Sequence, residues 1–244
     1  MLELQSVVEE LQTINDFARW AVSRFKEADL FYGHGTDNAW DEAVSLILHV
    51  LSLDYDLPES AWQARLTRKE KIRLVEVLMR RIEQRIPAPY LTHNMRFANL
   101  DFYVDENVLI PRSPVAELIL KRFEPWLHND HASRILDLCT GSGCIAIACA
   151  AYLPESLVDA VDISKAALVI AAKNSQKHLC EDRVTLYQGD LFAPLAKQGQ
   201  YDIIISNPPY VDAVDMANLP PEYQHEPALA LAAGADGLEI VDRI

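Results

Sequence analysis

The sequence has no long apolar run, no excess of basic residues and no paired-cysteine motif, and each absence argues against a class of protein. No stretch approaches the roughly 20 apolar residues of a membrane-spanning helix, so we expect no membrane association. The N-terminal residues Met-Leu-Glu-Leu-Gln lack the basic region and apolar core of a signal peptide. These absences together predict a cytoplasmic protein.

Acidic residues outnumber basic ones: 36 Asp and Glu against 22 Lys and Arg give a formal net charge of −14. Proteins that hold phosphate backbones need clustered Lys and Arg, so we expect no direct sequence-specific binding of nucleic acid. The negative charge suits a basic partner, although it is also a common means of staying soluble. At 244 residues the chain can form one large domain, or a small domain and a medium one.

The four cysteines never occur at C-x-x-C spacing, and three of them lie in an apolar stretch of small residues. We therefore expect buried, reduced thiols and no metal centre or disulfide. The residues concerned are Cys139, Cys144, Cys149 and Cys180.

The first part of the chain predicts helices. Asn38 is a good N-cap for a helix over 39–51, and Thr67 and Glu70 form a capping-box pattern before another apolar-periodic run. We expect a small helical domain over residues 1–95, for docking or support, in which His34 and His49 are not ligands. Residues 96–110 then predict a linking β-hairpin with its turn near Asp105-Glu106-Asn107.

From residue 111 to 244 strands and helices alternate. Ser113 followed by Pro114 predicts a helix start. The alternation that follows predicts βαβ units and an α/β domain with a doubly wound, mostly parallel sheet. The predicted strands are 135–139, 158–161, 184–187 and 202–206, and the clearest predicted helices are 145–152 and 164–177.

Each of the first three strands ends in residues suited to a nucleoside. Asp137 is followed by Thr140-Gly141-Ser142-Gly143, whose glycines allow a tight turn before a helix N-terminus. Asp162 follows the second strand and can accept hydrogen bonds from ribose hydroxyls. Asp190-Leu191 follows the third, where Asp190 can accept from an adenine amino group. The order of these features predicts a nucleoside pocket.

Taken singly, these features also allow another function or a purely structural role. The glycine turn also fits G-x-G-x-x-A, so a dinucleotide dehydrogenase is an alternative, although Asn-Pro-Pro-Tyr would have no task in such an enzyme. Asp137 alone could cap backbone groups, and Asp162 alone could begin the helix at Ser164.

The fourth strand ends abruptly at Asn207-Pro208-Pro209-Tyr210. Neither proline can donate a ladder hydrogen bond, so an Asn side chain and free carbonyls lie at the carboxyl end of the strand. Such acceptors can bind both hydrogens of an –NH2 group while the tyrosine ring stacks on its plane. The alternative is a proline-rich turn without function.

In this order the glycine turn, Asp162, Gly189-Asp190 and Asn-Pro-Pro-Tyr resemble the S-adenosylmethionine-dependent methyltransferases that modify a planar –NH2 group. In that superfamily Asn-Pro-Pro-Tyr marks enzymes that act on adenine amino groups or glutamine amides. The helical domain with its hairpin, Val108-Leu109-Ile110-Pro111-Arg112, and Glu226-Pro227-Ala228-Leu229-Ala230-Leu231 with Gly234 and Gly237 resemble the protein glutamine N(5)-methyltransferases specifically.

Two segments resemble the branch that methylates large-subunit ribosomal protein three. Release-factor enzymes usually continue Pro-Arg with Pro-Glu-Thr-Glu, whereas here Ser113-Pro114-Val115-Ala116-Glu117-Leu118 follows, and residues 31–43 also resemble the ribosomal branch. The resemblance implies S-adenosylmethionine as cofactor and a ribosomal protein, methylated before or during assembly, as partner. It implies cofactor contacts at Asp137, Thr140, Gly141, Gly143, Asp162, Asp190, Leu191 and Asn207, substrate contacts at Asn207, Pro208, Pro209 and Tyr210, and catalytic roles for Asn207, Pro208 and Tyr210.

An amide nitrogen is a poor nucleophile, so positioning is the main catalytic task. We expect the Asn207 side-chain oxygen and the Pro208 carbonyl each to accept one N–H of the substrate amide, with Tyr210 stacked on its plane. No general base is evident, and His225 is more typical of a loop residue. Arg112 is expected near the active site by resemblance, or else in a surface salt bridge.

A seven-stranded methyltransferase sheet would need strands beyond the fourth, so we expect this chain to be part of a longer protein, with loss of activity as one consequence. A release-factor glutamine methyltransferase is the first alternative. An adenine-amino methyltransferase on DNA or RNA and a non-catalytic binding fragment follow.

Overall fold

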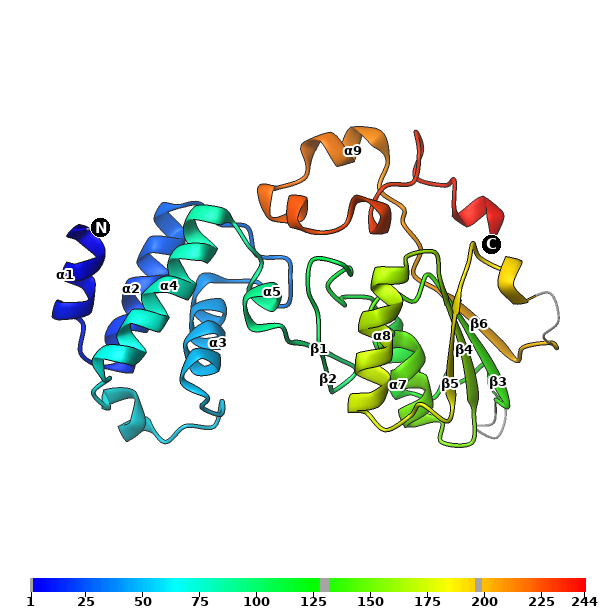
Figure 1. The fold of residues 1–244 in the computed structure, drawn as a ribbon, viewed down its shortest axis with the longest axis horizontal. Helices are drawn as coiled ribbons and strands as arrows, with labels where there is room; N and C mark the ends of the chain where they lie inside the picture. The colour runs from blue at the N-terminus through cyan, green and yellow to red at the C-terminus, as the bar shows by residue number, and fades with distance from the viewer. Residues whose placement is uncertain (1, 128–131, 196–198) are drawn as a thin grey trace. The chain divides into compact units, whose positions relative to one another are not determined.

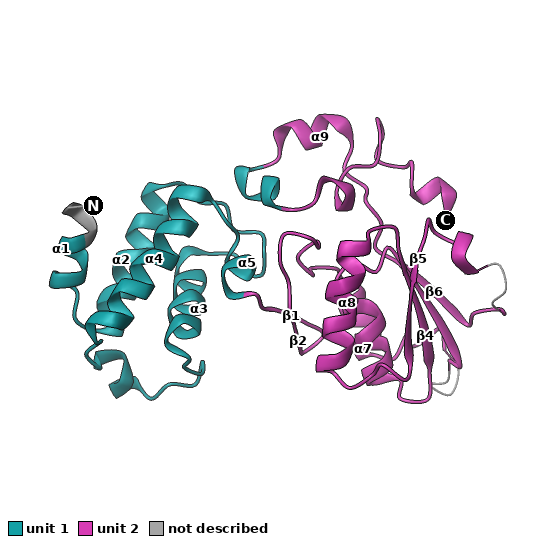
Figure 2. Ribbon diagram, in the orientation of Figure 1, with its two compact units in different colours: residues 1–92, 220–225 teal, residues 93–219, 226–244 magenta. Residues whose placement is uncertain are grey.

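The computed structural model describes residues 2–127, 132–195 and 199–244. They fall into two compact units (Figure 2). The helical unit contains the residues up to Thr92 together with Pro220–His225, and the sheet unit contains His93–Leu219 and Glu226–Ile244. In the described parts of the chain, no helix is long and apolar enough to span a membrane.

Side-chain caps set the helix starts of the helical unit. Thr13 forms a reciprocal capping box with Asp16, which starts α2 and separates it from α1. Asn38 caps α3, and Thr67 forms a capping box at the start of α4, so both predicted starts are confirmed. The elements are α1 Leu2–Glu10, α2 Ile14–Glu27, α3 Ala39–Leu51, the 3₁₀ turn η1 Glu59–Gln63, α4 Arg68–Gln84, α5 Ala88–Thr92 and the 3₁₀ turn η4 Pro221–His225.

The sheet unit is an α/β structure with four parallel strands in the order β5-β4-β3-β6 (Figure 1). The predicted strands and the two predicted helices between them are confirmed to within one residue at each end. The register pairs Leu138 with both Val161 and Ser206, which brings the carboxyl ends of neighbouring strands to one edge. The strands are β3 Arg134–Leu138, β4 Leu157–Asp162, β5 Val184–Gln188 and β6 Ile203–Ser206.

The main core of this unit lies between the sheet and helix α7 (Cys144–Tyr152). Helix α8 (Lys165–Lys177) packs beside α7 and against β4 and β5 (Figure 1). Helix α7 is apolar all round and buried from Cys144 to Ala150, as expected of a helix enclosed on several sides. All four cysteines are free, and three of them are buried. On the opposite face Leu136, Leu138 and Val161 pack with Leu195. The remaining elements are α6 Val115–Leu120, η3 Ala193–Leu195, α9 Ala213–Asn218, η5 Ala228–Ala230 and η6 Val241–Arg243.

The hairpin lies earlier than predicted. Strands β1 (Met95–Phe97) and β2 (Leu100–Phe102) are joined by Ala98-Asn99, and both turn residues have positive φ angles, 45° and 59°. A two-residue turn of this kind needs left-handed backbone at both positions, and alanine gives little signal for it. The predicted turn near Asp105-Glu106-Asn107 is therefore wrong as a hairpin turn. Those residues form a separate turn, in which Asp105 Oδ1 accepts from Asn107 N at 3.0 Å.

The predicted start of α6 is one residue early. The first helical residue is Val115, and Ser113 Oγ accepts from its backbone N–H at 3.3 Å.

Candidate functional site

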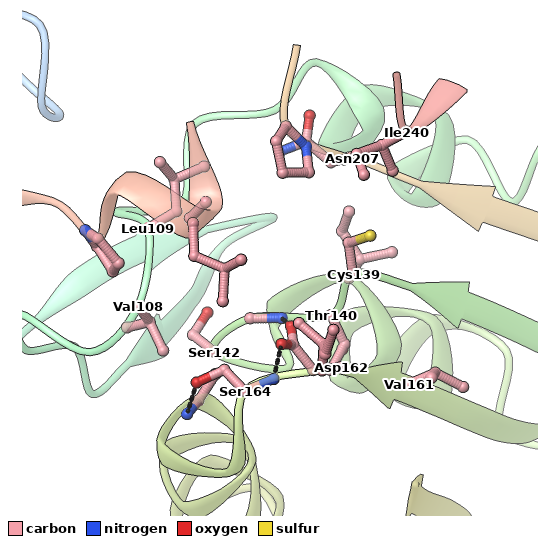
Figure 3. A pocket seen from close by; sticks show the side chains of 18 of the residues that line it. Val108, Leu109, Cys139, Thr140, Ser142, Val161, Asp162, Ser164, Asn207 and Ile240 are labelled. Carbon is pink, nitrogen blue, oxygen red and sulfur yellow. Dashed lines mark hydrogen bonds between the residues drawn. The ribbon is translucent and has the colours of Figure 1, made fainter. Parts of the chain in front are cut away.

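A cavity of about 210 Å³ lies at the carboxyl ends of the four strands, wholly within the sheet unit (Figure 3). This is the edge at which open parallel sheets bind ligands. Its walls come from the glycine turn (residues 140–143), the ends of β4, β5 and β6, the stretch after the hairpin, and the segment after Glu226. Residues that line it include Asn107, Val108, Pro111, Arg112, Thr140, Gly141, Asp162, Asp190, Leu191, Asn207, Pro209, Pro227 and Leu229.

The glycine turn joins β3 to α7 in a conformation that favours glycine. Gly143 has φ +79°, and a Cβ there would lie 3.1 Å from side-chain atoms of Ala171 and Ile147, so α7 and α8 could not approach as closely with a larger residue. Gly141 has φ +56°, and no atom lies within 4 Å of the position that a Cβ would take, so its backbone faces open space. The turn can therefore lie directly against a bound group.

Asp137 supports this turn from behind and is not among the residues that line the cavity. Its Oδ2 accepts from Thr140 Oγ1 at 2.6 Å and from Ala146 N at 3.2 Å. The side chain is fully buried, and Oδ1 has no hydrogen-bond partner among the described residues. Burial raises the pKa of Asp137 to about 7. The predicted cofactor contact at Asp137 stays a prediction; in the structure its carboxylate holds the Thr140 hydroxyl of the glycine turn and the Ala146 N–H in the first turn of α7.

Asp162 ends β4 and faces the cavity. Its Oδ2 accepts from Gly141 N and its Oδ1 from Ser164 N, both at 2.8 Å, so it links the glycine turn to the start of α8 (Figure 3). Burial raises the pKa of Asp162, although the backbone donors at Ser164 and Gly141 act in the opposite direction. Each carboxylate oxygen can accept a second hydrogen bond, which leaves capacity for a diol.

The end of β5 contributes one apolar and one charged wall residue. Leu191 is buried and has φ +47°, and it lines the cavity. Asp190 also lines it, but its carboxylate forms an ion pair with Arg243, another lining residue. The pair is about half exposed, so solvent screens it and it is weak. A ligand amino group at Asp190 would compete with this arginine.

The Asn-Pro-Pro-Tyr loop (residues 207–210) follows β6. Asn207 and Pro209 line the cavity, whereas Pro208 and Tyr210 are not among the lining residues. Asn207 lies on the opposite side of the cavity from Asp162 in Figure 3. The Tyr210 side chain is 64% exposed, and a Cβ on Gly237 would lie 2.5 Å from the Tyr210 carbonyl oxygen. The backbone of the loop therefore lies close against Gly237, where a larger residue would clash, while the tyrosine ring is exposed to solvent.

Two sequence segments that resemble the glutamine methyltransferases meet at this site through an ion pair. Arg112 Nη1 and Nη2 donate to Glu226 Oε1 and Oε2 at 2.6 and 2.7 Å, and Glu226 Oε1 also accepts from Ile110 N at 3.0 Å. The Glu226 side chain is fully buried. A bidentate pair with a buried partner fixes geometry better than an exposed one. The pair therefore joins the two walls that include Pro111 and Pro227, rather than lying as a salt bridge on the surface.

Asn174 on α8 has a role that no sequence pattern predicted. Its fully buried side chain accepts from Tyr103 N at 2.7 Å and donates to Tyr103 O at 3.0 Å and to Ser142 O at 2.9 Å. One amide thus joins the stretch after the hairpin to the glycine turn. Lone asparagines within helices usually give no functional signal, since they are common on exposed helix faces.

The remaining candidates lie outside this chemistry. Burial raises the pKa of Cys139 to about 12, so the thiol in the cavity wall stays protonated. His225 Nε2 lies 2.7 Å from the Gln84 carbonyl oxygen, and His34 packs on Tyr223, both within the helical unit. In the part of the chain that the structure describes, no three His, Cys, Asp or Glu side chains gather as metal ligands would.

Part of the sheet unit matches a known protein family. Residues 116–220 match the family model of the methyltransferase small domain. The fold, the strand-end cavity and this match define the class: the protein is an α/β methyltransferase that uses S-adenosylmethionine.

Two curated relatives identify the family within the class. The ribosomal protein uL3 glutamine methyltransferase of Neisseria gonorrhoeae is 50% identical over 237 residues, covering 97% of this chain and 79% of the relative. That of Xanthomonas campestris pv. campestris is 51% identical over 239 residues, covering 98% and 77%. The chain belongs to the family of ribosomal protein uL3 glutamine methyltransferases.

Solved structures are more distant. The hMettl16 catalytic domain in complex with MAT2A 3'UTR hairpin 1 aligns with a TM-score of 0.49 and 16% identity, covering 81% of this chain and 70% of that one. A likeness of this size adds nothing to the assignment.

Proposed function

We propose that this protein transfers a methyl group from S-adenosylmethionine to the side-chain amide nitrogen of a glutamine in ribosomal protein uL3. The observation that carries the proposal is the position of Asn207, an amide acceptor at the end of β6 that lines the same cavity as Asp162. The relatives named for this activity supply the identity of the substrate.

The residues of the cavity suit the cofactor. The open backbone at Gly141 admits a bound group against the turn, and Asp162 keeps acceptor capacity for the two ribose hydroxyls. Leu191 supplies an apolar wall for a purine, and Asp190 supplies an acceptor for its amino group once Arg243 is displaced. When bound, S-adenosylmethionine supplies an activated methyl group. Asp137 keeps its task of holding the glycine turn.

The substrate amide would be held by the Asn-Pro-Pro-Tyr loop. In this proposal Asn207 Oδ1 and the Pro208 carbonyl oxygen each accept one N–H of the glutamine side chain. Two acceptors in these positions orient the nitrogen lone pair and favour its pyramidal form as positive charge develops. Tyr210, whose ring is exposed, would stack on the amide plane. The surplus proton would pass to water after transfer.

The partner and setting follow from charge and family. The formal charge of −14 suits a basic protein and disfavours a grip on phosphate backbones, so we propose that uL3 is methylated before or during assembly of the large subunit. We place this reaction in the cytoplasm.

The test is methyl transfer from radiolabelled S-adenosylmethionine to three acceptors: free uL3, a release factor and an adenine-containing duplex. Label on a single glutamine of uL3 is expected. Label on the release factor instead would move the enzyme to the neighbouring branch, and label on the duplex would overturn the substrate class. Cofactor binding without transfer to any acceptor would favour a non-catalytic binding role.

A further inference from the structure

The stretch between the Asn-Pro-Pro-Tyr loop and the return of the chain to the cavity is anchored at one point. Val211 precedes this stretch and Glu226 ends it, and every residue between them is described. Helix α9, within the stretch, has no buried residue. Glu222 is the single buried residue between those two positions, and it lies in residues 220–225, which belong to the helical unit. We call residues 220–225 the strap.

The Glu222 carboxylate is held by the helical unit through a buried ion cluster. Its Oε1 accepts from Arg81 Nη1 at 3.1 Å, from Arg85 Nη1 at 3.2 Å and from Phe31 N at 3.1 Å. Arg81 is itself fully buried, and its Nε donates to Glu42 Oε1 at 2.7 Å. Two arginines thus balance two glutamates, the arrangement in which buried charge is tolerated.

Neutral contacts of the strap reinforce this anchor. The Tyr223 ring packs against Phe31 and His34, with ring centroids 5.7 and 4.6 Å apart. His225 Nε2 lies 2.7 Å from the carbonyl oxygen of Gln84. Phe31 and His34 belong to the 31–43 segment, so part of that segment has its partner within this chain.

The chain reaches the cavity directly after the strap. Glu226 forms the bidentate pair with Arg112, and residues 226–232, the return segment, include four cavity-lining residues. Val211 N donates to Leu231 O, and Ala233 N donates to Val211 O, both at 2.9 Å. The return segment is therefore bonded to the residue that follows the Asn-Pro-Pro-Tyr loop. The lining residues are Pro227, Leu229, Ala230 and Ala232.

The strap has little reason to keep its shape alone. It forms a 3₁₀ turn of five residues, η4, and such turns are weak without tertiary support. Glu226 lies only four positions after Glu222, which limits the distance between their Cα atoms to about 14 Å. Without the anchor, residues 212–225, which include α9, would be held only at their two ends, and we expect their motion to reach both ends.

We propose that Glu222 is a positioning residue: by holding the strap, the arginines of the helical unit hold the return segment and the Asn-Pro-Pro-Tyr loop in place for methyl transfer. The helical unit then has a task in catalysis besides docking. The activity part of this inference rests on the proposed function, whereas its structural part does not.

The structural part is tested by hydrogen exchange on Glu222→Gln and on the matched control Glu42→Gln. Each variant removes one carboxylate charge from Arg81 with little change of shape, but only Glu222 lies on the strap. We expect Glu222→Gln to speed exchange at the Val211 and Ala233 amides by roughly tenfold, since these bonds depend on the return segment. Glu42→Gln should leave them unchanged. Equal exchange in both variants, or no acceleration in Glu222→Gln, would overturn the proposal.

A second variant covers the case in which Glu222→Gln does not fold. Tyr223→Ala with His225→Ala removes neutral contacts of the strap and leaves the ion cluster whole. A smaller acceleration at the same two amides is expected, and its absence contradicts the proposal.

Activity provides the last readout. We expect kcat for uL3 methylation to fall roughly tenfold in Glu222→Gln and to stay near the wild-type value in Glu42→Gln, as loss of positioning predicts. If the wild-type protein does not methylate uL3, the proposed function fails while the exchange result still decides the role of the strap. If the wild type is active and both variants match it, the positioning role is wrong.

Discussion

In the helical unit the buried guanidinium of Arg81 is enclosed by the carboxylates of Glu42 and Glu222, whereas in the sheet unit the buried carboxylate of Asp137 is held only by a hydroxyl and a backbone N–H. The first arrangement balances every charge it buries. Each leaves one carboxylate oxygen without a partner among the described residues, Glu222 Oε2 in the first and Asp137 Oδ1 in the second. The difference is the counter-ion, because Glu222 pairs with arginine whereas Asp137 forms no ion pair among the described residues. A buried carboxylate without a counter-ion costs stability, so its retention next to the glycine turn calls for a different reason.

The difference separates polar groups that hold the fold from polar groups that serve a ligand. Asp162 and Asn207 line the cavity with hydrogen-bonding capacity left over, while Arg81 has donors committed to three different partners. We therefore expect substitutions in the helical unit to change mainly the free energy of unfolding. Substitutions at the strand ends should change mainly the turnover and the affinity for the cofactor.

The largest effect is expected for Arg81→Met. The variant leaves Glu42 buried without its cation, which costs about 3–5 kcal/mol of unfolding free energy. Arg80, the exposed neighbour on α4, provides the control, because Arg80→Met should change stability by less than about 0.5 kcal/mol. Urea denaturation measures both. If the two variants lost similar amounts of unfolding free energy, the buried ion cluster would stabilise the protein no more than an exposed charge does, and the proposed difference between the units would be wrong.

Asn207→Ala tests a polar side chain that lines the cavity of the sheet unit. We expect turnover to fall a hundredfold or more, as on removal of one preorganised polar contact. The unfolding free energy and the dissociation constant for S-adenosylmethionine should stay close to wild type. Asn218→Ala on the exposed helix α9 is the control. Turnover near the wild-type value in Asn207→Ala would remove the proposed role of this side chain.

A smaller effect is expected for Asp162→Ala. Loss of its charge-assisted hydrogen bonds should weaken S-adenosylmethionine binding by about 1–3 kcal/mol. Calorimetric titration measures this, with the exposed Asp182→Ala as control. An unchanged dissociation constant would argue against the ribose assignment.

Asp137→Asn should give the smallest effect in mild acid, where Asp137 is itself neutral, and a difference that grows as the pH rises. The folded-state pKa of Asp137 is raised to about 7, from the ordinary value of 3.8. The native state therefore retains a proton that the unfolded chain loses, and this contribution to stability is lost as pH rises from about 4 to about 7. Asparagine does not titrate, so the melting temperature of the variant relative to wild type should rise between about pH 4 and pH 7 and then stay level. If the difference in melting temperature between the variant and the wild type stayed constant across that pH range, Asp137 would not titrate as proposed.

Local patterns were enough to predict the fold class. Capping residues at Asn38 and Thr67 and the alternation of apolar strands with helices predicted elements that the structure confirms. The hairpin turn was missed because Ala98 adopts left-handed backbone that alanine seldom adopts. Neighbouring residues in the sequence predict those helices and strands whose formation depends on the same neighbouring residues.

The supports of the site could not be predicted in the same way. Arg112 bonds a residue 114 positions away, Arg81 one 141 positions away, and Asn174 one 71 positions away. Such pairings follow from the tertiary structure and leave no periodic trace in one sequence. The strand-end residues were easier to predict, because a parallel sheet brings all its carboxyl ends to one edge. Asp137 is nevertheless not among the residues that line the cavity, because it precedes the turn and its carboxylate accepts from Thr140 within the turn.

The three hydrogen bonds of Asn174 also bear on the order of folding. Its partners Tyr103 and Ser142 lie 71 and 32 residues earlier in the chain, so these bonds close only after α8 has docked on the sheet. Closing a contact between residues far apart in the sequence loses chain entropy before the contact stabilises the fold, so we expect such contacts to form late. We therefore expect the glycine turn to reach its final shape near the end of folding. The ability to bind cofactor should accordingly appear after most of the helical signal during refolding, which makes binding a probe of the last step.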